Sequence, residues 1–273
     1  MRLGIFAKTF PGSEPRTVLA QAKAAGFDAV QYNMACSGLP SLPDAISEAQ
    51  ASAIREAAAE NGLGIAAVSG TYNMIHPDIA VRERGMAQLE VLAAACAGMS
   101  TTVITLCTGT RDPYDQWRGH PDNGSAKAWA DLLAEMGKAA TIAERHGILL
   151  GIEPELANVV DSAVRARQLI DAIASPSLAI VLDPANLFEY ESLPEQRDIV
   201  SRAIDLLADR IVMGHAKDRT VDGAFTTAGT GVLDYAHYLG RLRAIGFSGD
   251  LVTHGLDAAE APSVARFLGR ALQ

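Results

Sequence analysis

The chain has 273 residues, 49% of them hydrophobic and 20% charged, a balance that can bury the core of one globular domain. Its net charge of −9 argues against a nucleic-acid partner, because a phosphate backbone is bound by basic surfaces. No stretch approaches the roughly 20 apolar residues of a membrane span, and the first residues lack a signal-peptide pattern. We therefore expect a cytoplasmic protein with no membrane partner.

Cysteine usage agrees with that expectation. Cys36, Cys96 and Cys107 are odd in number and widely spaced, which is typical of free thiols in a reducing compartment. We expect Cys96 and Cys107 to pack in the core.

Short apolar or β-branched runs alternate along the chain with long amphipathic stretches. The predicted strands are residues 3–7, 29–32, 64–69, 102–106, 148–153, 178–183, 211–215 and 250–254. The predicted helices are residues 14–25, 41–61, 79–98, 125–146, 162–174, 195–208, 235–245 and 259–272. Four glycines that each follow a helix and precede a strand are expected in left-handed C′ positions: Gly26, Gly62, Gly147 and Gly246.

Alternating strands and helices of this number predict a parallel sheet closed into a (β/α)₈ barrel, formed as a single domain over residues 1–273. A doubly wound open sheet is the alternative, but no glycine-rich dinucleotide motif follows the first strand. The two long loops, residues 107–124 and 215–234, leave the carboxyl ends of strands, where a barrel keeps its active site.

Ionisable residues end each of the last four predicted strands: Glu153, Asp183, His215 and His254. Equivalent positions on neighbouring strands of a barrel point to a shared mouth. Two carboxylates and two imidazoles suit one divalent ion, which the set leaves open among Mn²⁺, Co²⁺, Zn²⁺, Fe²⁺ and Mg²⁺. Taken singly, each residue could be solvated or a turn residue, as Asp183 before Pro184 could be.

The motifs around these residues resemble the xylose isomerase-like barrel superfamily, in its sugar phosphate isomerase/epimerase branch. The likeness extends upstream to residues 69–78 and 107–123, and so covers nearly the whole chain. The segments that carry it are GIEPE (151–155), LDPANLF (182–188), GHAKD (214–218) and SGDLVTHGL (248–256).

The resemblance implies a divalent metal held by Glu153, Asp183 and His215. The fourth position departs from the family pattern, because His254 stands where a glutamate is expected. In the epimerases two glutamates form the acid/base pair, so here only Glu153 can act as a glutamate base. His254 could ligate the metal through a neutral imidazole or act as the acid opposite Glu153.

Further side chains are expected near the mouth as substrate ligands: His76, His120, Lys217, Asn186 and Arg111. Each has a structural alternative. The two histidines could belong to helix entries capped by Asp78 and Asp122, and Lys217 could form a surface ion pair. Arg118 could also clamp an anion and Trp117 could cover the pocket, whereas Glu155 is a second choice to Glu153.

These residues predict an isomerase or epimerase that removes a proton next to the carbonyl of a small sugar or polyol, neutral or anionic, and passes through an enediolate. A dehydratase or lyase shares the first step and stays open, as does a non-catalytic sugar-binding barrel. Phosphodiester cleavage, known in this superfamily, is disfavoured by Asn186, by His254 and by the acidic charge. A homodimer or homotetramer is possible.

Overall fold

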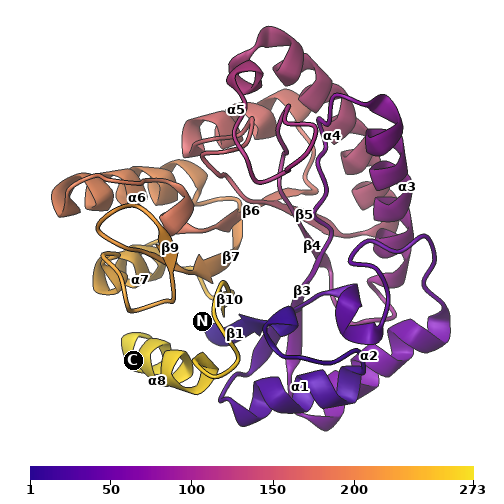
Figure 1. The fold of residues 1–273 in the computed structure, drawn as a ribbon, viewed down its shortest axis with the longest axis vertical. Coiled ribbons are helices and arrows are strands. Elements are labelled where there is room, and N and C mark those ends of the chain that lie inside the picture. The colour runs from indigo at the N-terminus through magenta and orange to yellow at the C-terminus, as the bar shows by residue number, and fades with distance from the viewer.

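The computed structural model describes residues 1–273, and its centre is a closed barrel of eight parallel strands (Figure 1). The strands follow one another around the barrel in chain order. They are β1 (Arg2–Phe6), β2 (Ala29–Tyr32), β3 (Gly64–Ser69), β4 (Val103–Leu106), β5 (Leu149–Ile152), β6 (Leu178–Leu182), β7 (Ile211–Ala216) and β10 (Asp250–Thr253). The predicted (β/α)₈ barrel is thereby confirmed.

Eight α-helices surround the barrel, one after each strand (Figure 1). They are α1 (Pro15–Ala24), α2 (Glu48–Glu60), α3 (Ile79–Ala95), α4 (Ala126–His146), α5 (Ala163–Ile173), α6 (Leu193–Leu207), α7 (Tyr235–Ala244) and α8 (Ala261–Ala271). Short 3₁₀ turns η1 to η4 cover Ala7–Thr9, Met34–Ser37, Pro121–Gly124 and Pro184–Asn186. The four glycines predicted at helix ends all have positive φ. No helix combines the length and the apolar character needed to cross a membrane.

Side-chain alternation along the strands separates the barrel interior from the layer beneath the helices. Ala67, Val181, Met213 and Val252 form a small buried cluster inside the barrel. Glycine supplies the interior position on two other strands, because a Cβ on Gly4 or Gly151 would meet the side chain of Val252 or Val181 at 3.0 and 2.7 Å. The much larger hydrophobic core lies outside, between the strands and the helices. The barrel floor is therefore filled by apolar side chains and by two glycines.

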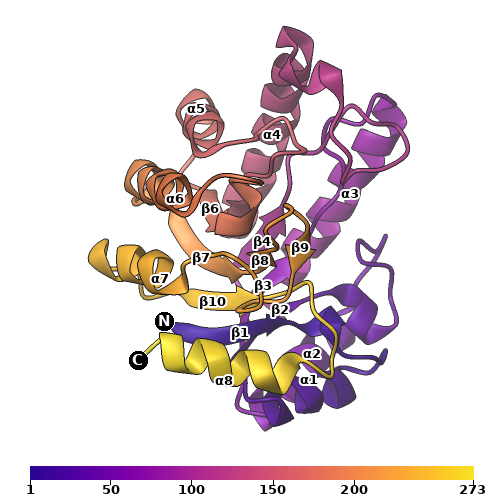
Figure 2. The ribbon, with the colours of Figure 1, turned by 60° about the vertical axis from the view of Figure 1, so that its left-hand side comes forward.

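Two local predictions were wrong. The helix expected over residues 41–61 begins only at Glu48, because Pro43 interrupts the turn and Ser47 forms a capping box with Gln50. The loop expected over residues 215–234 contains an antiparallel hairpin of β8 (Asp218–Arg219) and β9 (Phe225–Thr226), which Figure 2 shows beside β7 and β10. This hairpin brings part of the long loop back over the barrel mouth.

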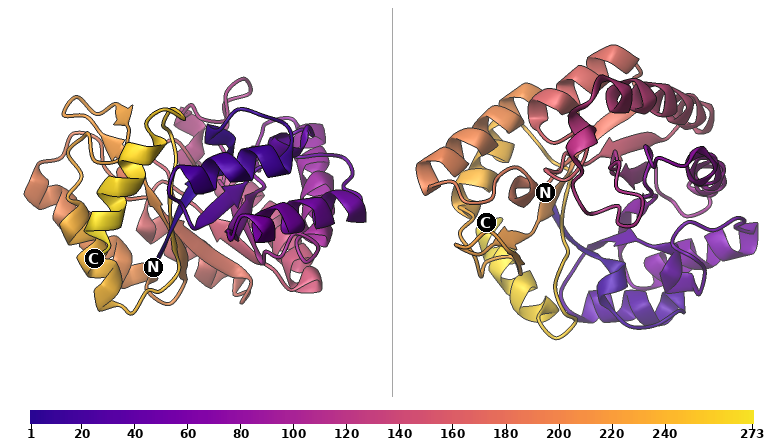
Figure 3. Two further views of the ribbon diagram at one scale, coloured as in Figure 1. Left: turned by 90° about the horizontal axis from the view of Figure 1, so that it is seen from below. Right: turned by 45° about the horizontal axis from the view of Figure 1, so that its top comes forward.

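The first and last strands close the barrel. β1 pairs with β10 over four residues, and the Arg2 guanidinium adds a two-pronged contact to the Asp250 carboxylate at 2.7 and 2.8 Å. Figure 3 shows the two termini near each other, with α8 lying along the N-terminal strand. The mouth at the opposite end of the strands is thus built from both ends of the chain.

Candidate active site

One residue from each barrel strand points into the mouth, two positions beyond the residue that fills the floor. On β6, β7 and β10 the floor residues Val181, Met213 and Val252 are followed by Asp183, His215 and His254. The other five strands follow the same period of two and place Phe6, Gln31, Ser69, Thr105 and Glu153 there. Alternation therefore explains why the four predicted residues meet.

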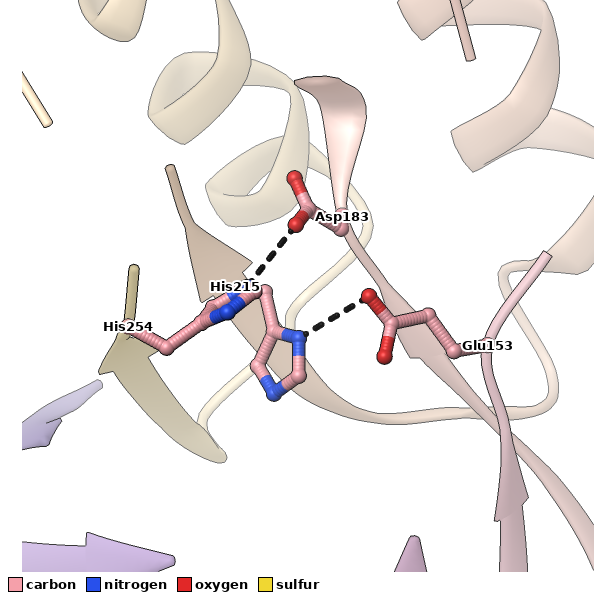
Figure 4. A group of neighbouring side chains, drawn as sticks. All are labelled: Glu153, Asp183, His215 and His254. Atoms are coloured by element: carbon pink, nitrogen blue, oxygen red, sulfur yellow. Dashed lines mark hydrogen bonds and ion pairs between the residues drawn. The ribbon is translucent and has the colours of Figure 1, made fainter. Parts of the chain in front are cut away.

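Glu153, Asp183, His215 and His254 form a single cluster (Figure 4). One possible ligand atom from each lies within 4.8 Å of those from the other three. His215 Nδ1 is 3.2 Å from Glu153 Oε1, and His254 Nε2 is 3.0 Å from Asp183 Oδ2. The two imidazole rings are tilted against each other with centroids 4.4 Å apart.

Burial and neighbouring charges set the ionisation of the cluster. Burial alone would raise the pKa of Glu153, but the adjacent His215 imidazole outweighs it and the pKa falls. Burial acts in the same way on Asp183, where Lys217 and His254 hold the pKa well below its usual range. Burial, together with His215, lowers the pKa of His254. The site thus favours two ionised carboxylates and a neutral His254.

Lys217 and Asn186 connect the two carboxylates. The Lys217 ammonium is 3.4 Å from Asp183 Oδ2 and donates to Asn186 Oδ1 at 2.7 Å. The Asn186 amide in turn donates from Nδ2 to Glu153 Oε1 at 2.7 Å. Because Oε1 accepts this bond and faces His215, Glu153 Oε2 is left without a protein partner and is free to face a substrate.

A cavity of about 530 Å³ opens above the cluster. Glu153, Asn186, His215, Lys217 and His254 all line it, as predicted for a shared mouth. Glu155 also lines it, and burial with the charge of Glu153 raises its pKa to about 7. Trp117, which was expected to cover the pocket, lines the cavity together with Gln31 and Asn33.

Several lining residues were missed, in particular Lys8, Ser69, Thr105, Gln116 and Phe225. Ser69 and Thr105 could have been found, since they occupy the same inward register as Glu153. Phe225 could not, because it reaches the cavity through the unexpected hairpin, where its ring lies 3.7 Å from the Lys217 ammonium.

Three predicted substrate ligands do not line this cavity. Arg111 is held by Asp131 and by the carbonyl of Ile75, so its guanidinium is engaged within the protein. His76 accepts a hydrogen bond from the Asp78 amide at 3.0 Å and contacts the Pro113 carbonyl. His120 accepts similarly from Asp122 at 3.2 Å and lines a different, neighbouring cavity.

The donor set fits a divalent metal. Two carboxylate and two imidazole groups converge, with Asp183 fully buried and His215 almost so, and these are the donor types that divalent ions bind in proteins. Glu153, Asp183, His215 and His254 could therefore hold one divalent ion.

Comparison with known proteins supports the architecture. The model of the xylose isomerase-like TIM barrel family matches residues 19–265. No curated protein sequence matches the chain. Among solved structures, 3-keto-D-glucoside 4-epimerase from E. coli is similar with a TM-score of 0.77 and 17% identity, over 99% of each chain.

Two sugar 3-epimerases are similar to the same degree. L-ribulose 3-epimerase has a TM-score of 0.76 and 21% identity, over 99% of this chain and 94% of its own. D-allulose 3-epimerase from Methylomonas sp. has a TM-score of 0.76 and 18% identity, over 100% and 98%. At these identities the structures show a shared fold, and the family match over most of the chain confirms the resemblance carried by the strand-end motifs. The chain belongs to the xylose isomerase-like TIM barrel family.

Proposed function

We propose that this protein is a divalent-metal-dependent isomerase or epimerase that moves a proton on a carbon next to the carbonyl of a sugar or polyol. The observation that carries the proposal is the convergence of Glu153, Asp183, His215 and His254 beneath a polar cavity. Structurally similar proteins are sugar epimerases, which supports a sugar as the substrate.

Glu153 is the proposed base. Its Oε1 is fixed by Asn186 and His215, and its Oε2 has no protein partner, so Oε2 can accept a proton from a bound substrate. A bound divalent ion would polarise the substrate carbonyl and the adjacent hydroxyl, which makes the carbon-bound proton more acidic.

Two other groups complete the proposed chemistry. Lys217 holds a buried positive charge beside the cluster and can stabilise negative charge that develops on a substrate oxygen. Figure 4 shows Glu153 and His254 on opposite sides of His215. This arrangement supports a role for His254 in holding the ion or in returning a proton on the face opposite Glu153.

Exchange of substrate protons in D₂O tests this function. Protein loaded with Zn²⁺ or Mn²⁺ is incubated with ketohexoses, inososes and keto acids, and products are followed by mass spectrometry and NMR. We expect deuterium at the carbon next to the carbonyl without loss of water. Glu153→Gln should slow exchange by roughly 10²–10⁴-fold, because its amide cannot accept the proton.

The outcomes separate the alternatives. A product lighter by one water would support a dehydratase or lyase that shares the first step. Absence of exchange with every compound would leave a sugar-binding barrel as the better description. Metal analysis of Glu153→Gln is the control, because an inactive variant without metal would say nothing of the base.

A further inference from the structure

A second cavity, of about 370 Å³, lies beside the mouth. Both cavities are lined by the loops that follow β4 and β5. Trp117 and Glu155 line the first cavity, whereas Gly119 and Leu156, close by in the same loops, line the second. Neighbouring residues of the same two loops therefore line both cavities.

The loop after β4 contacts the loop after β5, and each loop carries an exposed apolar side chain. A Cβ added to Gly119 would lie 3.7 Å from the Ala157 Cα, and Asn123 Nδ2 donates to the Ala157 carbonyl at 2.9 Å. In these loops Trp117 is 53% exposed and Leu156 is 40% exposed. Trp117 lines the first cavity and Leu156 the second, so each cavity offers an exposed apolar side chain to the apolar face of a ligand.

The second cavity also offers polar groups with unused hydrogen-bonding capacity. His120 Nδ1 accepts from the Asp122 amide, which fixes the ring and leaves Nε2 without a protein partner. The Arg165 guanidinium lies 3.8 Å over the Trp129 ring and donates to Gln168 only through Nη1. Asp161 accepts from Ser162 through Oδ1, which leaves Oδ2 free.

These groups favour an uncharged polyhydroxylated ligand over an anion. Asp161 and Arg165 carry opposite charges, so the cavity has no excess of positive charge for a phosphate. Fixed imidazole, carboxylate and guanidinium groups instead match the donors and acceptors of sugar hydroxyls.

We propose that the second cavity is a subsite for a second sugar ring, so that the substrate is a glycoside rather than a free monosaccharide. This inference rests on the proposed function for the identity of the first ring. The reacting ring lies over Glu153, the linkage crosses Trp117 and Leu156, and the second ring contacts His120, Asp161 and Arg165.

Calorimetric binding to the Zn²⁺-loaded protein tests the subsite without turnover. The probes are D-fructose and four keto-disaccharides that differ in linkage: turanose, maltulose, leucrose and isomaltulose. At least one disaccharide should bind about tenfold more tightly than D-fructose, as expected for one or two added hydrogen bonds and the apolar contact. His120→Ala and Arg165→Gln should each remove most of this difference and leave D-fructose binding unchanged.

His76→Ala is the matched control. His76 begins the same His-Pro-Asp sequence and accepts from the second following amide, as His120 does, but it lines neither cavity. It should leave disaccharide binding unchanged.

The subsite is overturned if no disaccharide binds more tightly than D-fructose, or if His76→Ala and His120→Ala weaken disaccharide binding equally. Deuterium exchange distinguishes this failure from failure of the proposed function. Exchange with monosaccharides but not with disaccharides would remove the subsite and keep the proposed function. Tight disaccharide binding without exchange of any compound would keep the subsite and remove the proposed function.

Discussion

His254 determines the ratio of nitrogen to oxygen donor groups in the cluster. It supplies a second imidazole, hydrogen-bonded to Asp183 and in ring contact with His215, and burial lowers its pKa. A neutral imidazole is a borderline donor that Zn²⁺, Co²⁺ and Fe²⁺ accept more readily than Mn²⁺ or Mg²⁺ do. The side chain at this position should therefore set the metal preference of the site.

Replacing His254 with Glu tests that preference. We expect wild-type protein to bind Zn²⁺ more tightly than Mn²⁺, and His254→Glu to narrow the ratio of the two dissociation constants by about tenfold, because a hard oxygen donor replaces nitrogen. Competition titration with a chelator measures both constants without activity. An unchanged ratio would mean that His254 is not a ligand.

At the level of single residues, strand-end position was the informative signal. Glu153, Asp183, His215 and His254 could be predicted to meet because alternation and barrel closure decide where they point. The sequence pattern could not show whether His76 and Arg111 reach the substrate, because the geometry of the loops decides where these side chains point. In the structure both side chains are engaged within the protein rather than in the mouth.

Among the elements, the hairpin of β8 and β9 depends on one buried carboxylate. Asp218 accepts backbone hydrogen bonds from Arg219 and Leu233 through Oδ1, both at 2.9 Å. Its Oδ2 accepts from Gly229 and Gly231 at 3.0 and 3.1 Å. Gly231 is required for this approach, because a Cβ there would lie 2.5 Å from Asp218 Oδ1. The carboxylate thereby fixes the loop that carries Phe225 into the cavity.

Asp218→Ala should loosen that loop, because four backbone N–H groups lose their acceptor. Leaving buried donors unpaired costs about 1–3 kcal/mol each, an upper bound here since a loosened loop can find water. Hydrogen exchange followed by mass spectrometry should show faster exchange in residues 219–233. Asp222→Asn, an exposed change in the same hairpin, is the control. Equal exchange in wild type and Asp218→Ala would contradict the role of the carboxylate.

Helices and strands could be predicted where the apolar pattern extends over enough residues, and the exceptions have local causes. The eight strands and eight helices lie where the apolar pattern placed them, with shifts mostly at their ends. The prediction of a helix before α2 was wrong because Ala and Ile there continue a helical pattern, which Pro43 and the Ser47 cap interrupt. The hairpin was not predicted because strands of two residues are too short to show an alternating pattern. Contacts between Asp218 and amides distant in the sequence define these strands instead.

On the scale of the whole molecule, the pairing of β1 with β10 makes the barrel depend on both ends of the chain. The interior cluster likewise joins residues from β3, β6, β7 and β10. Elements that share one closed sheet and one core lose their contacts together, so we expect the chain to unfold as one cooperative unit. The three cysteines offer a direct way to examine this expectation.

All three thiols should be unreactive in the folded protein. Burial raises the pKa of Cys36 to about 11 and that of Cys96 to about 12, and it raises the pKa of Cys107 as well. The thiolate is the reactive form, so a disulfide reagent at neutral pH should modify none of them until the chain unfolds.

Ser13→Cys, at an exposed position, should react at once and shows that the reagent is competent. Ala203→Cys adds a buried probe in α6, in the second half of the chain. Pulse labelling along a urea gradient, resolved by mass spectrometry, should give the same midpoint for Cys36, Cys96, Cys107 and Cys at 203, coincident with loss of circular dichroism. A thiol that becomes labelled at clearly lower urea would instead identify a part of the barrel that opens on its own, and the chain would then contain more than one folding unit.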